Sequence, residues 1–595
     1  MTDPMRTLVV ATVITASVLW MVPTASGEDA AVLTPPEVWS TYDPDKGAFD
    51  EEIIRQWTEE GARYKEVYFS AYVDGHTVRV YGLYAVPEGA TGVPAVMHLH
   101  GGGQTVSKPW LETWMARGYA CLSCNYHGVW DNRDRYTLYP EALKQGNHKH
   151  SGSKLMATHP AVRESSWYIW SAVARRALSY LRQQPGIDKN HIGAFGVSMG
   201  GTTMWSFAMD PRLRAACAIY GCGWNRFHRN IPRFAKRPSQ AELKEADRIW
   251  QAGMAPEAYP PYLTCPMLFL SATNDHHGKM DRAYQTLERM KEGTPWRIGL
   301  TARQRHHIGS GFDKTLLAWM DCWLKGEGKL PETPGASITL NGDGVPTLTV
   351  APDLPDAVKA IHVFYAVDNP DAVSRNWRDA KTKGTGGAVK ALLPVMDVNQ
   401  RLFAIANVCY QDGVVLTSQL ATVIPADLGD AKATDTHSLV IYDGSDEIGM
   451  WTTNSPGTDP IPGRIRTALR PSVGPDGRKG FTVGAHFSPL THQLGDPKWR
   501  GSGGAKLSLD IATSKDQTLV VAVLEPHREY RKAVALKGSP GWQTVVVSVD
   551  ELREAKRGLP LKNWTSVTTL ELTRPEKAPW ADEGIRFTDV HWVVK

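Results

Sequence analysis

The sequence predicts an α/β protein with a mostly parallel, doubly wound sheet, followed by two all-β sandwich domains. Three observations predict this order. Apolar runs bounded by turn residues alternate with helical periodicity up to residue 329. A Pro-Glu-Thr-Pro segment follows at 331–334, and short alternating strands succeed one another beyond it. We therefore expect an α/β domain at 28–329, a small β-sandwich at 330–435 and a jelly roll at 436–595.

The first 27 residues have the pattern of a secretory signal peptide. Arg6 precedes the apolar run 8–22, and the small residues 25–27 provide a cleavage site. The run is short for a membrane span and is followed by Pro23. We expect the signal to be removed, leaving a periplasmic or extracellular protein without a stable membrane span. An uncleaved anchor is the alternative.

Composition excludes some classes of function. The 66 basic and 62 acidic residues nearly balance, and the basic ones form no stripe, so we expect no nucleic-acid partner. The seven cysteines lack the spacing of a disulfide framework. His98 and His100 share one face of a predicted strand, but no third ligand follows at a suitable spacing. We therefore expect neither a metal nor a cofactor.

The segment Gly196-Val197-Ser198-Met199-Gly200-Gly201 follows the apolar run 191–195. It matches G-x-S-x-G, in which a strand ends, the chain turns sharply and a helix begins. Glycines two residues before and after the serine remove side chains that would collide in so tight a turn. The N-terminus of the next helix would point at Ser198 and favour a developing oxyanion. The motif thus predicts that Ser198 is a nucleophile.

A glycine-rich loop supplies the second part of this predicted site. The apolar run 94–100 indicates a strand that is buried on both faces, and it ends in Gly101-Gly102-Gly103. In such a loop the backbone itself can approach a substrate oxygen. We expect the amides of Gly102 and Met199 to form the oxyanion hole.

An acid and two histidines complete the predicted triad. Asp275 ends the buried strand 266–275, and His306 and His307 lie on the loop after the last predicted strand, 296–301. A serine hydroxyl needs an imidazole to accept its proton, and the imidazole needs a carboxylate to fix its tautomer. We slightly favour His307 as the base because it leaves enough chain before the closing helix. His306 is the alternative base.

The sequence also supports structural predictions for three other segments. Residues 49–64 are predicted to form a helix in an N-terminal arm. The long polar loop 125–154 contains several histidines and aromatics and is expected to line the substrate pocket. Residues 221–260 interrupt the alternation of strand and helix and are expected to form a cap over the site.

Residues 77–328 resemble the α/β-hydrolase superfamily, nearest to its dienelactone-hydrolase and acetyl-xylan-esterase type. The resemblance is carried by the segments 100–103, 196–201 and 271–275 and by the paired histidines. It implies hydrolysis of carboxylic esters, with an acylated sugar as substrate. Dienelactone hydrolases use a cysteine nucleophile, whereas this chain has Ser198, so the resemblance does not imply that activity.

The last predicted domain is similar to jelly-roll carbohydrate-binding modules. The segment Gly541–Val545, followed by Trp564 and by a last strand with Trp592, carries this similarity. It implies glycan binding by residues 436–595. A purely structural sandwich that packs on the enzyme is the alternative.

These patterns favour a secreted serine carboxylic-ester hydrolase that deacylates polysaccharides through a Ser-His-Asp triad and an acyl-enzyme. The expected partner is a small-molecule or polysaccharide ester. One alternative is a secreted prolyl-type peptidase, although the aromatic residue usual next to that nucleophile is replaced by Met199. A non-catalytic glycan-binding protein is another, and the complete set of triad residues argues against it.

Overall fold

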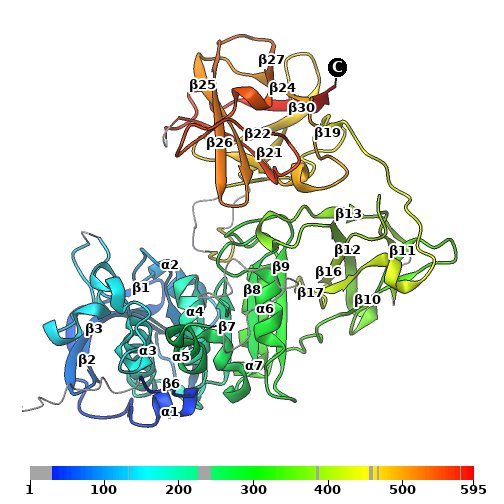
Figure 1. Ribbon diagram of the computed structural model, residues 1–595. Coiled ribbons are helices and arrows are strands. Elements are labelled where there is room, and N and C mark those ends of the chain that lie inside the picture. Colours follow the sequence, from blue (N-terminus) through cyan, green and yellow to red (C-terminus); the bar gives the residue numbers. More distant parts are fainter. Residues whose placement is uncertain are drawn as a thin grey trace, which may run out of the picture.

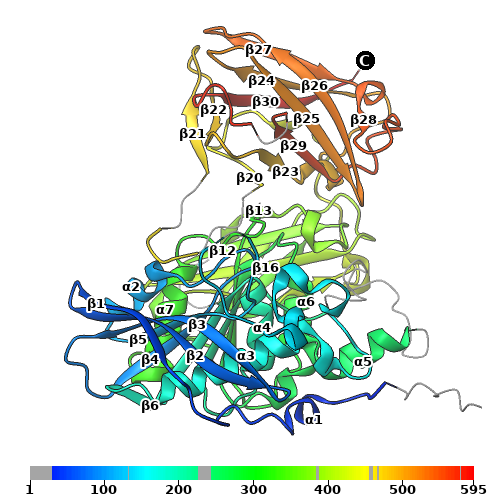
Figure 2. The same ribbon diagram turned by 90° about the vertical axis from the view of Figure 1, so that its left-hand side faces the viewer.

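The computed structural model describes residues 30–131, 133–224, 243–383, 388–454, 460–464, 468–575 and 578–594. The predicted signal peptide at 1–27 lies outside these residues, as does the segment 225–242 of the predicted cap. The described chain forms an α/β domain, with one β domain beside it and another above it (Figures 1 and 2). Among the described helices, none has the length and apolar character needed to cross a membrane.

The α/β domain is built on a nine-stranded sheet in the order β1-β2-β3-β5-β4-β6-β7-β8-β9. The strands are β1 (Glu52–Glu59), β2 (Ala62–Val73), β3 (His76–Pro87), β4 (Val93–Leu99), β5 (Ala120–Asn125), β6 (Ile187–Val197), β7 (Ala215–Ile219), β8 (Met267–Ala272) and β9 (Trp296–Thr301). Strands β4 to β9 are parallel, and β1 to β3 pair antiparallel at one end. The carboxyl ends of the parallel strands therefore meet at one edge, where ligand sites form in such sheets.

Helices cover both faces of this sheet, as predicted for a doubly wound fold. The helices are α1 (Pro35–Trp39), α2 (Lys108–Met115), α3 (Ser166–Arg182), α4 (Met199–Phe207), α5 (Glu245–Gly253), α6 (Met280–Leu287) and α7 (Phe312–Lys325). Trp110 of α2 and Trp319 of α7 share a core on one face, and Trp170 of α3 and Trp205 of α4 lie in the core on the other. Large aromatic side chains thus fix these helices against the sheet.

The helix predicted over 49–64 is wrong, because this segment forms strand β1 and the start of β2. The chain turns at Glu60 and Gly61, whose φ angles are 50° and 72°. Two successive positive φ angles form the turn that joins paired antiparallel strands. Trp57 stacks on Tyr64 across the turn with 5.1 Å between ring centroids, so alternate side chains share one face of a hairpin.

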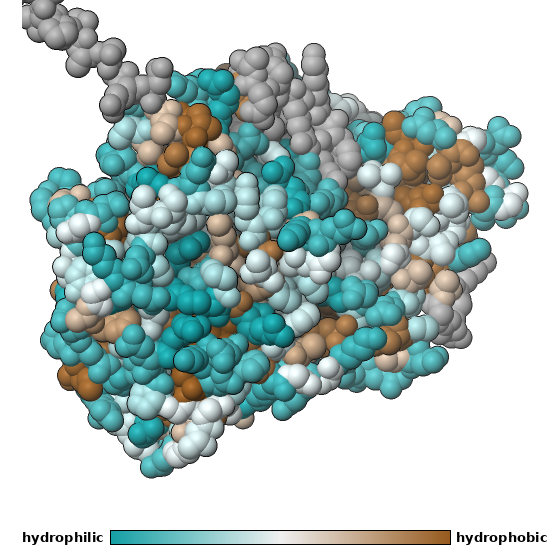
Figure 3. Space-filling view, turned by 90° about the horizontal axis from the view of Figure 1, so that it is seen from below, coloured by the Kyte–Doolittle hydropathy of each residue, from teal (hydrophilic) through white to brown (hydrophobic). Residues whose placement is uncertain are grey.

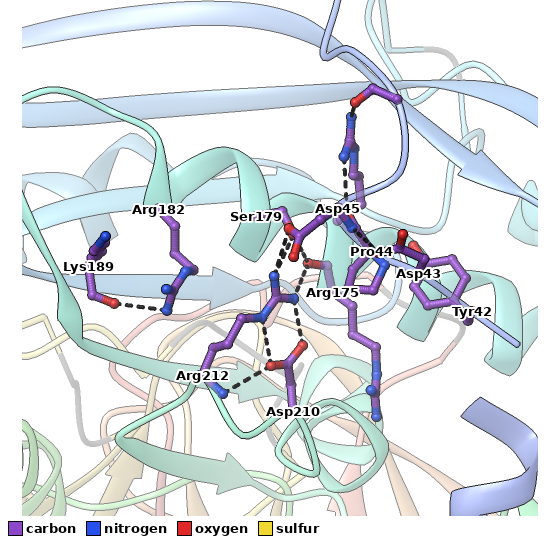
Figure 4. Close-up of polar contacts among 12 residues, drawn as sticks. Tyr42, Asp43, Pro44, Asp45, Arg175, Ser179, Arg182, Lys189, Asp210 and Arg212 are labelled. Atoms are coloured by element: carbon purple, nitrogen blue, oxygen red, sulfur yellow. Dashed lines mark hydrogen bonds and ion pairs between the residues drawn. The ribbon is translucent and has the colours of Figure 1, made fainter. Parts of the chain in front are cut away.

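Arg212 ties the N-terminal arm to the α/β domain (Figure 4). Its guanidinium donates to Asp45 Oδ1 at 3.0 Å, to Ser179 Oγ of α3 at 2.7 Å and to Asp210 Oδ2 at 2.7 Å. The contacts join the arm, α3 and the connection before β7.

Seen from below (Figure 3), the molecule presents mainly hydrophilic side chains, with hydrophobic ones in smaller groups between them.

The second domain consists of two antiparallel sheets with orders β10-β11-β15-β14 and β13-β12-β16-β17, and β18 also pairs with β16. Its strands are β10 (Gly335–Leu340), β11 (Pro346–Ala351), β12 (Val358–Val367), β13 (Arg378–Ala380), β14 (Thr382–Lys383), β15 (Val389–Leu392), β16 (Leu402–Tyr410), β17 (Val415–Thr417) and β18 (Ala421–Val423). Leu348 and Val350 of one sheet pack with Val363 and Ala404 of the other. This is the packing of a β-sandwich.

The third domain also has two antiparallel sheets. Their orders are β21-β22-β30-β24-β27, with β19 on β30, and β20-β23-β29-β25-β26-β28. The strands are β19 (Val440–Tyr442), β20 (Trp451–Thr453), β21 (Leu469–Val473), β22 (Lys479–Val483), β23 (Pro489–Thr491), β24 (Lys506–Ala512), β25 (Gln517–Glu525), β26 (Arg528–Leu536), β27 (Trp542–Val547), β28 (Arg553–Glu554), β29 (Thr569–Thr573) and β30 (Arg586–Val593). Trp564 and Trp592 are buried in the core between the sheets. Both C-terminal domains are therefore all-β.

The second domain covers the β9 edge of the nine-stranded sheet. The amide of Leu300 in β9 donates to Thr417 Oγ1 at 2.7 Å, and the Leu300 carbonyl accepts from Asn407 Nδ2 at 3.0 Å. Side chains thus satisfy the backbone groups that an edge strand leaves open. Arg375 strengthens the contact, since its guanidinium donates to both carboxylate oxygens of Asp281 in α6 at 3.0 Å.

The third domain contacts the loop that follows β9. Thr452 Oγ1 donates to Gln304 Oε1 at 3.0 Å, and Arg305 donates to Asn454 Oδ1 at 3.1 Å. Gln304 and Arg305 are the two residues that precede His306.

All seven cysteines carry free thiols, and five of them are buried.

Candidate active site

Ser198 lies between the end of β6 and the start of α4, at the carboxyl edge of the sheet. Its backbone has φ 54° and ψ −111°, a conformation that is strained for a residue with a side chain. A Cβ on Gly196 would lie 2.2 Å from the Gly200 carbonyl oxygen, and one on Gly200 would lie 2.1 Å from that of Leu99. Glycine is therefore required at both positions, and the turn presents Ser198 as the motif predicts.

His306 lies between Ser198 and Asp275. Its Nε2 is 3.0 Å from Ser198 Oγ, and its Nδ1 is 2.9 Å from Asp275 Oδ1. The imidazole packs against the ring of Tyr220, whose hydroxyl accepts a hydrogen bond from the amide of Ile308 at 2.9 Å. The three side chains come from the ends of β6 and β8 and from the loop after β9, in the order that the sequence predicts.

The preference for His307 over His306 is corrected by this geometry. The His307 amide donates to the Arg305 carbonyl at 2.8 Å. The chain thus turns tightly here, and the two neighbouring imidazoles do not share one direction. His307 Nδ1 is buried without a hydrogen-bond partner, and burial together with the charge of His306 lowers the pKa of His307. The position of His306 depends on this turn, which spacing along the sequence does not reveal.

Asp275 is fully buried and held by three donors. Ser271 Oγ donates to Oδ2 at 2.8 Å, the His277 amide donates to Oδ1 at 2.8 Å, and His306 Nδ1 lies beside the same oxygen. Burial alone would raise the pKa of this carboxyl, but the charge and hydrogen bond of His306 and the contacts of His277 hold it below its ordinary value. Asp275 therefore stays ionised and can orient the imidazole.

Met199 and Gly102 lie next to each other above the serine. Met199 is the first residue of α4, so its amide has no acceptor within the helix. A Cβ on Gly102 would lie 2.7 Å from Met199 Sδ, whereas the neighbouring Gly101 amide already donates to Gln104 Oε1 at 2.7 Å. The arrangement leaves Gly102 and Met199 as the pair predicted for an oxyanion hole.

The loop at 125–154 reaches this pair. A Cβ on Gly102 would lie 3.5 Å from the ring of Trp130, and Trp130 packs on His148 with 3.9 Å between ring centroids. His148 in turn stacks on Trp170 of α3. Aromatic rings from the loop thus form a wall beside Gly102 of the predicted oxyanion hole.

His98 and His100 are buried and turned away from a shared ligand. His98 Nδ1 is 2.9 Å from Ser123 Oγ, and His100 Nδ1 is 2.8 Å from the Gly101 carbonyl. Burial lowers the pKa of His98 to about 3 and that of His100 well below its usual value, so both are neutral.

Asp275, His276 and His306 form a second group of side chains that could hold a metal ion, because their potential ligand atoms lie within 4.8 Å of one another. Two members of this group belong to the Ser198 site.

Sequence reasoning missed His277. Its Nδ1 is 3.3 Å from Ser198 Oγ, and its Nε2 is 3.0 Å from Thr202 Oγ1 in α4. The signal that could have found it is the pair His276-His277 directly after Asp275, at the carboxyl end of a strand where site residues gather.

Comparison with known protein families gives a match within the α/β domain. Residues 39–243, about a third of the 595 residues, match the family model of acetyl xylan esterase (AXE1). No curated protein matches the sequence.

Solved structures also match. Acetyl xylan esterase 1 from Thermoanaerobacterium sp. JW/SL YS485 is 14% identical over 51% of this chain and 96% of its own, with a TM-score of 0.38. Acetyl xylan esterase from Paenibacillus sp. R4 is 14% identical over 50% and 98%, also with a TM-score of 0.38. Because these scores are low, the fold assignment depends on the strand order and the serine turn. Over residues 39–243 the chain is similar to the acetyl xylan esterase (AXE1) family.

Proposed function

We propose that this protein is a serine carboxylic-ester hydrolase that removes acyl groups, acetyl above all, from polysaccharides. The observation that carries the proposal is the position of His306, within hydrogen-bond distance of both Ser198 Oγ and Asp275 Oδ1. The match to the acetyl xylan esterase family supports the choice of an acetylated glycan as substrate. The segment 1–27 supports a further part of the proposal, that the protein acts in the periplasm or outside the cell.

Acylation begins when Ser198 Oγ attacks the ester carbonyl. His306 Nε2 takes the hydroxyl proton, and ionised Asp275 stabilises the imidazolium that forms. The carbonyl oxygen becomes an oxyanion that the amides of Gly102 and Met199 receive. The intermediate then collapses, the bond to the alcohol oxygen breaks, and His306 gives its proton to the departing sugar hydroxyl.

Deacylation reverses these roles. A water molecule loses a proton to His306 Nε2 as it attacks the acyl-enzyme carbonyl. The second oxyanion is held by the same amides, and its collapse breaks the bond between the acyl carbon and Ser198 Oγ. The proton on His306 returns to Ser198, and the free acid leaves. Each step conserves protons among Ser198, His306, the attacking water and the substrate.

The first prediction is that Ser198→Ala lowers hydrolysis of p-nitrophenyl acetate and acetylated xylan by more than about a thousandfold, because it removes the nucleophile. Release of p-nitrophenol and of acetate measures the loss, and circular dichroism of the variant should match the wild type.

Near-normal turnover by a folded Ser198→Ala variant would overturn the assignment. Cleavage of prolyl amides by the wild type, with no release of acetate from either ester, would favour a peptidase instead.

A further inference from the structure

A second histidine touches the nucleophile. His277 Nδ1 lies 3.3 Å from Ser198 Oγ on one side, while His306 Nε2 lies 3.0 Å from it. The His277 backbone is fixed, because its amide donates to Asp275 Oδ1 at 2.8 Å. The ring is fixed as well, since Nε2 is 3.0 Å from Thr202 Oγ1.

The number of protons at Ser198 decides the direction of these hydrogen bonds. The hydroxyl has one proton, and His306 must accept it in order to act as the base. A hydrogen bond from the second imidazole therefore requires a proton on His277 Nδ1. Its Nε2 is then an acceptor, which the Thr202 hydroxyl can satisfy. We infer that His277 is a further catalytic residue that donates a hydrogen bond from Nδ1 to the Ser198 oxygen, with Thr202 as the positioning residue for this tautomer.

This inference rests on the proposed function and predicts which step His277 assists. In deacylation the bond between the acyl carbon and Ser198 Oγ breaks, and its electron pair goes to Oγ. The proton that Oγ receives comes from His306, while the His277 N–H stabilises the developing negative charge without being transferred. In acylation the same hydrogen bond makes Oγ a weaker nucleophile. His277 should therefore favour release of the acyl group over its uptake.

Rapid-mixing kinetics with p-nitrophenyl acetate tests this role. In His277→Ala we expect kcat to fall about tenfold, the effect of one hydrogen bond, with a p-nitrophenol burst that approaches one per active site. His277→Asn, whose amide can donate from nearly the same position, should recover most of kcat. Thr202→Val should reproduce part of the loss, and Thr202→Ser should not.

Two outcomes would overturn the role of His277. One is an unchanged kcat and burst in His277→Ala. The other is retained turnover in His306→Ala together with loss in His277→Ala, which would make His277 the base. Nitrogen NMR of labelled histidine in the resting protein reads the His277 tautomer without turnover. It therefore separates failure of this inference, a proton on Nε2, from failure of the proposed esterase activity.

A cavity between the three domains leads to a second, independent inference. It has a volume of about 450 Å³ and is lined by residues of the α/β domain, by 368–374 of the second domain and by loops of the third. Arg305 in its wall directly precedes His306 in the chain. The cavity therefore lies beside the loop that carries His306.

The described wall of the cavity holds two buried nitrogen atoms without a partner. His492 is only 7% exposed, and its Nδ1 lies 2.8 Å from Thr569 Oγ1, while Nε2 has no partner. Arg500 Nε is also buried and without a partner, although Nη2 donates to the Gly495 carbonyl at 2.7 Å and lies 3.4 Å from Asp368 Oδ2. Buried polar groups without partners are uncommon and indicate a bound group that supplies the missing hydrogen bonds.

Four carboxylates lie in the same wall, and each already has a partner. Asp281 is held by both guanidinium nitrogens of Arg375, and Glu525 Oε2 accepts from the Tyr530 hydroxyl at 3.1 Å. Asp368 Oδ2 lies 3.4 Å from Arg500 Nη2, and Asp371 Oδ1 lies 3.8 Å from Lys279 Nζ. Arg305 donates to the neutral side-chain amide of Asn454, and not to a carboxylate, in that contact. We propose that this cavity binds a sugar residue carrying a carboxylate, a uronic acid of the polysaccharide substrate. This deepens the proposed function by adding an acidic glycan to its substrate class.

Two measurements test the cavity. Calorimetry with Ser198→Ala should detect binding of a xylo-oligosaccharide that carries a glucuronic acid branch, and the variants Arg500→Gln and His492→Ala should weaken it about tenfold. In the active protein the same two substitutions should lower kcat/KM for acetylated acidic oligosaccharides more than for acetylated neutral ones. Equal binding of neutral and acidic oligosaccharides would overturn the proposal. Absence of turnover with every ester, with acidic binding intact, would overturn only the esterase activity.

Discussion

At the scale of single residues, the triad was largely predictable because each member follows a chemical requirement at a strand end. Ser198 and Asp275 follow from the motif and from the end of β8. The choice between His306 and His307 did not follow, since it is set by a tight turn at Arg305. His277 was missed because its function depends on a contact across the fold with Ser198 and not on a motif.

The second prediction concerns the two neighbouring histidines. His306→Ala should lower kcat by about 10⁴-fold or more, because no base then accepts the Ser198 proton. His307→Ala should change kcat far less, since Asp275 and Ser198 both face His306. Steady-state kinetics on p-nitrophenyl acetate measures both, and a larger loss in His307→Ala would contradict the assignment.

The third prediction is a pH dependence at Glu257. Burial raises the pKa of this carboxyl to about 7, and Arg282 and Arg289 offset only part of the effect. In the unfolded chain a glutamate titrates near pH 4.3, taken as roughly its reference value. Between these pH values the folded state holds a proton that the unfolded state has lost. The Glu257 contribution to stability therefore falls as pH rises from about 4 to 7.

Glu257→Gln tests this dependence. A glutamine keeps an acceptor for the Trp224 amide, which donates to Glu257 Oε2 at 2.8 Å, and carries no proton to lose. We expect the variant to exceed the wild type in stability at pH 8 by up to about 3 kcal/mol and to equal it near pH 4. Urea denaturation at the two pH values measures the difference, and the same difference at both would contradict the prediction.

At the scale of elements, periodicity located most strands and helices of the α/β domain but failed at 49–64. That segment contains apolar residues at helical spacing, yet Glu60 and Gly61 turn the chain and β1 completes the sheet by pairing with β2. Strand β2 also pairs with β3 on its other side. Pairing within the sheet thus outweighs the helical preference of the segment 49–64.

The fourth prediction concerns the covered edge of β9. Thr417 is fully buried, accepts from the Leu300 amide and donates to Asn407 Oδ1 at 2.7 Å. Thr417→Val keeps the shape but leaves both partners buried without a hydrogen bond. We expect a loss of about 2–3 kcal/mol in the free energy of unfolding. Thr417→Ser, which keeps the hydroxyl, is the matched control, and equal losses in the two would contradict the role of the hydroxyl.

At the scale of the whole molecule, the domains are joined by buried polar contacts that composition did not predict. The pair Arg375–Asp281 is one example, with side chains 0% and 4% exposed. Such a pair depends on where two distant segments meet, and neither residue stands out in the sequence.

The fifth prediction tests this joint. Arg375→Met leaves the Asp281 carboxylate buried without its guanidinium and should cost about 3–5 kcal/mol of unfolding free energy. Adding Asp281→Asn should recover part of the loss, since the buried charge is then gone. Arg464→Met is the control, because the Arg464–Glu112 pair is largely exposed and should cost less than about 1 kcal/mol. Denaturant titration measures all three, and a small effect of Arg375→Met would contradict the prediction.

The free thiols bear on what holds the domains together. The three domains are joined by packing, hydrogen bonds and ion pairs, and each of the seven cysteines is a free thiol. Burial raises the pKa of Cys121 and Cys217 well above the usual value, so these thiols stay protonated and unreactive. The contacts that join the described parts of the three domains are therefore all non-covalent, and the chain connections are the covalent links between them.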